Sequence, residues 1–157
     1  MSARRAAGAL PLSGQGQQAL ADAVWAEHAA VYAYGLVAAY AAAQRGAAVT
    51  EAAGAHRARR DAATALLRAA GAQPPPAEAG YVIPLPVTDP AAALALAAQV
   101  ERETAVAWRA VLERSEPTAP DVRASAVAAL TDCAVRGAGW RAVLAQSPPT
   151  TAFPGSP

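Results

Sequence analysis

The sequence contains no lysine, no asparagine and one cysteine among its 157 residues. A single thiol, Cys133, excludes a disulfide framework and any metal cluster that several cysteines would hold. Positive and negative side chains nearly balance, at a formal net charge of +1. Nucleic-acid binding normally requires a basic excess, so we expect no nucleic-acid partner.

Long apolar runs are also missing. No stretch without a charged residue or a histidine exceeds 16 residues, the length of Ala29–Gln44, which contains three tyrosines and a glutamine. A membrane helix needs about 20 mostly apolar residues, so we expect no membrane span. The twin arginine Arg4-Arg5 is not followed by the long apolar region of a secretory signal. We therefore predict an N-terminal arm over 1–13 and a cytoplasmic protein.

Alanine is what the sequence has in excess, with 49 residues in a chain that is 54% hydrophobic. Alanine is the best helix former, although a GC-rich coding sequence would also enrich it. Capping and breaking residues indicate helices independently of alanine. They predict four helices, at about 14–45, 51–70, 90–115 and 121–146. The signals used are Ser13, Gly46, Thr50, Gly71, Thr88-Asp89-Pro90, Pro117, Pro120 and Pro148-Pro149.

The lengths of the connections predict the topology. Short connections join the first helix to the second and the third to the fourth, which makes each pair antiparallel neighbours. The segment at about 71–89 carries prolines at 74–76, 84 and 86. In extended form it would cover on the order of 55 Å, more than the ~39 Å length of the third helix.

The sequence therefore predicts an all-α four-helix bundle over 14–146 with one long Pro-rich crossover between helices two and three. The resulting up-down-down-up order is that of ferritin-like folds. The alternative is a simple up-down-up-down bundle with the proline-rich loop packed on its end.

Ionisable side chains fall on the apolar face of every predicted helix, at about 100° per residue. Unpaired charges in a core are costly, so we expect these side chains to meet one another, water or a ligand. Two main interpretations stay open: a buried network that fixes helix register, or a ligand or metal pocket at the bundle centre. The candidates are Glu27, His28, Tyr34, His56, Arg59, Arg60, Glu101, Asp132 and Arg136.

Counting residues from the predicted turns gives each candidate a height along the bundle. Glu27 comes about eight residues, or ~12 Å, below Glu101, and His56 comes somewhat above it. The expected partners of Glu101, at its own height, are Tyr34, Arg60 and Arg136.

Four stretches resemble a bacterial ferritin-like domain family of uncharacterised function, common in high-GC Gram-positive bacteria. They are Ala26-Glu-His-Ala-Ala-Val-Tyr-Ala-Tyr-Gly35, His56-Arg-Ala-Arg-Arg-Asp61, Val87-Thr-Asp-Pro90 and Thr150-Thr-Ala-Phe-Pro-Gly155. The resemblance covers nearly the whole chain. It implies a ferritin-like four-helix bundle and no known activity.

Metal-active ferritin-like proteins hold two ions with a Glu from each of two helices and a Glu-x-x-His pair from each of the others. Neither histidine here has a glutamate three residues before it, and arginines lie on the core faces of helices two and four. We therefore predict that the di-metal centre is lost and that no cofactor is bound. The alternative is a weaker site for Fe or Mn, formed by Glu27 or Glu101 with His28 or His56.

No residue pattern marks a catalytic triad or a phosphate-binding loop, and a lone cysteine on an apolar face is usually a small hydrophobe. The sequence favours a non-enzymatic, self-associating bundle, a homodimer, in which a polar core network replaces the di-metal site. The alternative function is a degenerate ferritin-like enzyme or carrier that binds one metal or a small ligand in the core.

The tail at 147–157 has no charged side chain and contains the only phenylalanine, Phe153. An apolar anchor in a stiff extended segment is typical of a segment that docks, because little entropy is lost on binding. Three alternatives stay open: a frayed terminus, docking on the protein's own bundle, or an address peptide for a protein partner.

Overall fold

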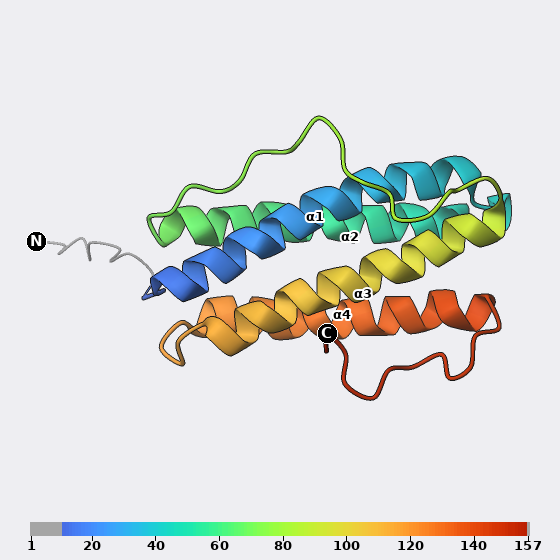
Figure 1. Cartoon of the computed structure of the whole chain (residues 1–157). Coiled ribbons are helices and arrows are strands. Elements are labelled where there is room, and N and C mark those ends of the chain that lie inside the picture. Colours follow the sequence, from blue (N-terminus) through green and yellow to red (C-terminus); the bar gives the residue numbers. More distant parts are fainter. Residues whose placement is uncertain (1–10, 157) are drawn as a thin grey trace, which may run out of the picture.

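Four long helices make up the computed structural model, which describes residues 11–156 (Figure 1). They are α1 (Gly14–Tyr40), α2 (Gly46–Ala69), α3 (Pro90–Arg114) and α4 (Pro120–Val143), with a short 3-10 turn, η1 (Ala43–Arg45), before α2. No strand occurs within 11–156, so the prediction of an all-α four-helix bundle is confirmed. Most of the predicted arm at 1–13 lies outside the described residues.

The helices follow the up-down-down-up order (Figure 1). From the end of α2 the crossover returns along the whole length of the bundle, so that α3 runs parallel to α2 and α4 runs parallel to α1. Contacts are extensive between α1 and α2, between α1 and α3, and between α3 and α4, whereas α2 and α4 touch much less. The long crossover excludes the simple up-down-up-down alternative.

Three of the expected helix signals act as predicted. The hydroxyl of Ser13 accepts a hydrogen bond from the Gly16 amide at 3.3 Å and begins α1. The carboxylate of Asp89 accepts one from the Ala92 amide at 2.9 Å, with Pro90 as the first helical residue of α3. Gly71 follows α2 with φ +79°, a left-handed conformation that glycine adopts without a side-chain clash.

The connection between α1 and α2 differs from the prediction. The first helix ends at Tyr40 rather than near 45, and the second begins at Gly46 rather than 51. Gly46 has helical angles and no side chain caps α2, so neither Gly46 nor Thr50 acts as predicted. The turn η1 leads directly into α2, which replaces the expected stop and restart. The fourth helix ends at Val143, short of the predicted 146.

Two apolar clusters fill the two ends of the bundle. One is centred on Leu20, Leu67 and Trp108, and the other on Tyr34 and Leu96, and alanines supply much of both. Small side chains let helices approach closely but leave little apolar volume. The middle of the bundle between these clusters holds buried polar residues. None of the four helices within residues 11–156 carries an uninterrupted apolar stretch of the length that a membrane span requires.

The C-terminal segment folds back on the protein's own bundle, against α3 and α4 (Figure 1). Arg109 Nη1 donates to Ser156 Oγ at 2.7 Å, and Arg141 Nε donates to the Pro149 carbonyl at 2.5 Å. Gly155 is the buried residue of this segment, whereas Phe153 is 72% exposed. Of the three alternatives for the tail, the structure shows docking on the protein's own bundle. The expectation that Phe153 is the anchor is wrong.

Candidate functional site

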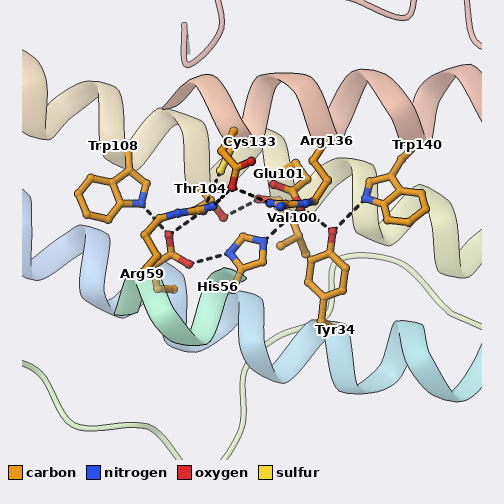
Figure 2. Close-up of polar contacts among 12 residues, drawn as sticks. Tyr34, His56, Arg59, Val100, Glu101, Thr104, Trp108, Cys133, Arg136 and Trp140 are labelled. Carbon is orange, nitrogen blue, oxygen red and sulfur yellow. Dashed lines mark hydrogen bonds and ion pairs between the residues drawn. The ribbon is translucent and has the colours of Figure 1, made fainter. Parts of the chain in front are cut away.

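Six charged side chains meet in the middle of the bundle, and all four helices contribute to this cluster, part of which is labelled in Figure 2. Three of them, from α1, α2 and α3, are fully buried: Glu27, His56 and Glu101. The other three lie toward the side where α2 faces α4: Arg59, Asp132 and Arg136. Together they form three carboxylates against two guanidinium groups and one imidazole, which we call the core network.

His56 bridges the two buried glutamates. Its Nδ1 lies 2.7 Å from Glu27 Oε2, and its Nε2 lies 3.2 Å from Glu101 Oε1. An imidazole can donate to two carboxylates at once only when both nitrogens carry protons. The geometry therefore fits the imidazolium form, which makes the core network electrically neutral.

Both glutamates receive further donors from aromatic side chains (Figure 2). Trp108 Nε1 donates to Glu27 Oε1 at 2.7 Å, and the Tyr34 hydroxyl donates to Glu101 Oε1 at 2.6 Å. Trp140 Nε1 in turn donates to the Tyr34 hydroxyl at 3.0 Å. A buried tryptophan or tyrosine normally needs such a partner for its polar atom, so the network satisfies these donors as well.

Arg59 connects the buried Glu27 to the half-exposed Asp132. Its Nη1 donates to Glu27 Oε1 at 3.2 Å and to Cys133 Sγ at 3.2 Å, and its Nη2 donates to Asp132 Oδ2. Arg136 donates to the same oxygen of Asp132 at 2.9 Å. Asp132 thus holds two guanidinium groups, and its side chain is 44% exposed.

Burial and charge shift the pKa values of three groups around the network. Burial alone lowers the pKa of His56, but hydrogen bonds to Glu101 and Glu27 and their charges outweigh it, so the pKa is raised overall. Burial, then the charge of Glu101, raises the pKa of Tyr34 and likewise that of the Cys133 thiol. Tyr34 and Cys133 therefore stay protonated at neutral pH.

The network reaches solvent through a groove between α2 and α4, which have the fewest contacts of the helix pairs that touch. One part of the groove, of about 640 Å³, is lined by Arg59, Trp108 and Asp132 among others. A second part, of about 370 Å³, adjoins Asp132, Arg136 and Trp140. Asp132 is common to both parts, so the exposed carboxylate marks the entrance to the core.

Among residues 11–156, one atom of the network has no hydrogen-bond partner, the buried Oε2 of Glu101. Glu101, Cys133 and Arg141 border a cavity of about 90 Å³ beneath the docked C-terminal segment. Gly137 makes this close approach of α4 feasible, since a Cβ there would lie 3.3 Å from Glu101 Cβ. A polar cavity of this size has room for water, which can satisfy such an oxygen.

Comparison with known proteins places the chain among homologues. A family model described as "Domain of unknown function (DUF4439)" matches residues 19–157. The chain belongs to this family. It is also similar to the crystal structure of a conserved hypothetical protein, rv2844, from Mycobacterium tuberculosis, at 41% identity and a TM-score of 0.80. That match covers 84% of this chain and 99% of the other.

No curated protein matches the chain significantly. Membership of a family of uncharacterised function, expected from the sequence, is thus confirmed.

Six of the nine candidate residues form the core network, a seventh, Tyr34, donates to its Glu101, and two take no part in it. His28 is half-buried, and burial together with the charge of Arg60 lowers its pKa. Arg60 is not a partner of Glu101 as predicted, because its Nη2 pairs with Asp61 at 2.9 Å. The expected pairing of Glu101 with Arg136 is also wrong, since Arg136 binds Asp132.

His56 lies between the two glutamates rather than above Glu101 as predicted. The reason is the start of α2, which comes five residues earlier in the chain than expected, at position 46 instead of 51. Each residue of α2 therefore lies about five positions, or ~7.5 Å, further from the start of the helix than the count from the predicted turn had placed it. This displacement brings His56 down to the gap between Glu27 and Glu101.

The polar roles of Trp108 and Trp140 were missed, because both were counted only as apolar residues. The available signal was chemical: a tryptophan on a core face carries an N–H that needs an acceptor. Trp108 lies two turns from Glu101 on α3, but its acceptor, Glu27, lies on α1.

The residues in the core do not fit a di-metal centre. Both nitrogens of His56 are engaged by carboxylates, and Glu27 already accepts from an indole and a guanidinium. Metal coordination needs neutral imidazole and free carboxylate lone pairs. Within 11–156, no group of three or more His, Cys, Asp or Glu side chains is placed to hold an ion.

Proposed function

We propose that the protein is a non-enzymatic, ferritin-like bundle in which the core network takes the place of a di-metal centre and fixes the register of the helices. The observation that supports this most strongly is the imidazole of His56 between Glu27 and Glu101. Cationic side chains supply there the positive charge that metal ions would otherwise supply between the carboxylates.

A structural role fits the way in which the network joins the helices. The bonds of His56 and Arg59 connect α2 to α1, α3 and α4. Breaking such a buried pair is costly because it leaves a charge without a partner. A shift of one helix by a single turn would separate several pairs at once, so the network disfavours other registers.

The same geometry argues against catalysis by the network. His56 and both glutamates are fully buried, so a substrate could not reach them without opening the bundle. The raised pKa of Cys133 keeps it in the thiol form, which is a poor nucleophile.

Metal addition tests the proposal. We expect iron or manganese to leave the melting temperature of the purified protein unchanged, because a ligand that binds only the native state must raise it. Elemental analysis of protein purified without chelator should find no stoichiometric Fe, Mn or Zn. A saturable rise in melting temperature that Glu27→Gln abolishes would contradict the proposal.

A second candidate function is a carrier that holds a small ligand or one metal ion at the core. It is favoured by the groove between α2 and α4, where Asp132 is 44% exposed and is held by two arginines. A ligand with its own carboxylate could take the place of Asp132 on Arg59 and Arg136. A co-purifying small molecule in native mass spectra would support this function over the structural one.

Our proposal includes self-association as a homodimer and a possible protein partner for the tail. Val127 and Val135 on α4 are 50% and 68% exposed, and Phe153 on the tail is 72% exposed. Exposed apolar residues are common at protein–protein contacts when they form a patch. A cytoplasmic location is in keeping with the free thiol of Cys133, since thiols stay reduced there.

A further inference from the structure

A cavity lies between α1 and α3, beneath the crossover, on a part of the bundle that the core network does not use. Its volume is about 260 Å³. Alanines of α1 are part of its lining, and Tyr81 and Ile83 of the crossover border it as well. The size is slightly below the range of pockets for drug-sized ligands, which favours a small ligand.

Aromatic rings flank the cavity. Trp25 and Tyr81 both line it and pack edge to face, with centroids 5.4 Å apart at 67°. Tyr32 in turn packs against Tyr81, with the two ring centroids 5.6 Å apart. Trp25 is nevertheless 49% exposed, so much of its ring is free to contact a ligand.

The charged side chains that line the cavity are all acidic. Among the described residues that line it, the charged ones are Asp22 and Glu103, and none is an arginine or a histidine. Neutral glutamines one turn away hold both carboxylates: Gln18 donates to Asp22 and Gln99 donates to Glu103, each at 2.8 Å. Neither carboxylate has a cationic neighbour among the described residues of the lining.

We propose that this cavity binds a small organic cation, a protonated or quaternary amine with an apolar body. Aromatic faces attract cations through the ring quadrupole, and rings of this kind recognise quaternary ammonium groups. The carboxylates of Asp22 and Glu103 add an attraction of the same sign, and the alanine lining accepts the apolar body. An anionic ligand would meet only repulsion from these groups.

The inference is independent of the proposed function. None of the charged residues of the core network lines the cavity, so a ligand here would not disturb them. A failure of cation binding would leave the account of the core intact, and the reverse also holds.

Benzyltrimethylammonium is a suitable probe, with its uncharged carbon analogue neopentylbenzene and the anion phenylacetate as matched controls. Trp25 reports binding, since Trp108 and Trp140 are buried at 1% and 5% exposure. We expect a saturable change in tryptophan fluorescence with the cation. We expect affinity at least about tenfold weaker for the neutral analogue, the scale of a desolvated cation–π contact.

Calorimetry on variants separates the two sources of affinity. Trp25→Leu keeps an apolar side chain but removes the ring, and we expect about tenfold weaker binding of the cation. The double variant Asp22→Asn, Glu103→Gln should lower the affinity for the cation several-fold and make cation binding less sensitive to salt. Glu51→Gln, which changes an exposed carboxylate on α2 outside this cavity, should leave binding unchanged.

Three results would overturn the proposal. They are the absence of saturable binding of the cation, equal affinity for the neutral analogue, and full affinity in Trp25→Leu. Equal affinity for cation and neutral analogue would identify an apolar pocket with no preference for charge.

Discussion

His56 gives the core a definite response to pH. Its pKa is raised in the folded protein by Glu101 and Glu27 despite burial, whereas in the unfolded chain it is about 6.5. A group of this kind binds its proton more tightly when folded. The contribution of His56 to stability is therefore complete below about pH 6.5, and it is lost as the pH rises through the pKa that His56 has in the folded protein.

We predict that the free energy of unfolding decreases between about pH 6.5 and pH 8, by at most ~1.4 kcal/mol per pH unit for one proton. Denaturant melts across this range measure the slope. The variant His56→Gln should flatten this slope. The variant His28→Gln should leave it unchanged, because the pKa of His28 is lowered in the folded protein. Ionisation of His28 therefore changes the stability only below about pH 6.5, and there with the opposite sign. An unchanged slope in His56→Gln would contradict the assignment.

The upper limit of this range follows from Cys133. Burial raises the pKa of its thiol, so above about pH 8.5, where an unfolded thiol ionises, Cys133 also reduces stability as the pH rises. Keeping measurements below this value isolates His56.

Glu101 and Glu103 provide a second test at this scale, because they are two residues apart with opposite environments. Glu101 is fully buried and bonded to Tyr34 and His56, whereas Glu103 is exposed and bonded to Gln99. We predict that Glu101→Ala costs about 3–5 kcal/mol of stability and Glu103→Ala no more than about 0.5 kcal/mol. Equal losses in denaturant melts would contradict the burial of Glu101.

Helical periodicity was sufficient to identify most residues of the network, because a charge on an apolar stripe is conspicuous. It could not supply their partners. Pairing depends on the relative heights of the helices, and an error of five residues at the start of α2 was enough to misplace His56. Arg136 illustrates a different limit: its partner Asp132 lies one turn away on the same helix, whereas a partner on another helix had been expected.

Among the elements, the C-terminal segment is held by contacts that allow no extra atoms at Gly155. Its φ of +77° is left-handed, and a Cβ there would lie 2.7 Å from the Ala105 carbonyl oxygen and 2.8 Å from Arg109 Cβ. A side chain at this position would therefore strain the backbone and collide with α3.

We predict that Gly155→Ala releases the segment from the bundle. The left-handed conformation alone costs about 1–2 kcal/mol for alanine, so the released population should rise about tenfold or more. Limited proteolysis with subtilisin, followed by mass spectrometry, measures cleavage of the tail. Gly71→Ala is the matched control, with φ +79° but nothing within 4 Å of the added Cβ, and it should leave tail cleavage unchanged.

Helix ends were predictable where a side chain makes the cap. Ser13 and Asp89 each accept a backbone hydrogen bond, and the helices that follow them begin where the sequence indicates. The start of α2 has no side-chain cap, so Gly46 and Thr50 gave misleading signals there. The tail shows the same limit, because its docking depends on Gly155, a residue that carries no side chain to mark a contact.

For the whole molecule, connection lengths carried most of the information about topology. The proline-rich crossover is long enough to span the bundle, and it does so. Chain lengths contain no information, however, on how closely two helices approach across the bundle. The small contact between α2 and α4, and with it the groove that exposes Asp132, became apparent only from the structure.

That small contact has a consequence for the motions of the native state. Since α2 packs on α1, α1 on α3 and α3 on α4, α1 and α3 are inner helices and the other two are outer ones. Outer elements can detach locally at a lower free energy than the whole fold, and their amides then exchange sooner with deuterium. We therefore expect the slowest exchange in α1 and α3, and the bonds from His56 and Arg59 determine how much sooner the amides of α2 exchange.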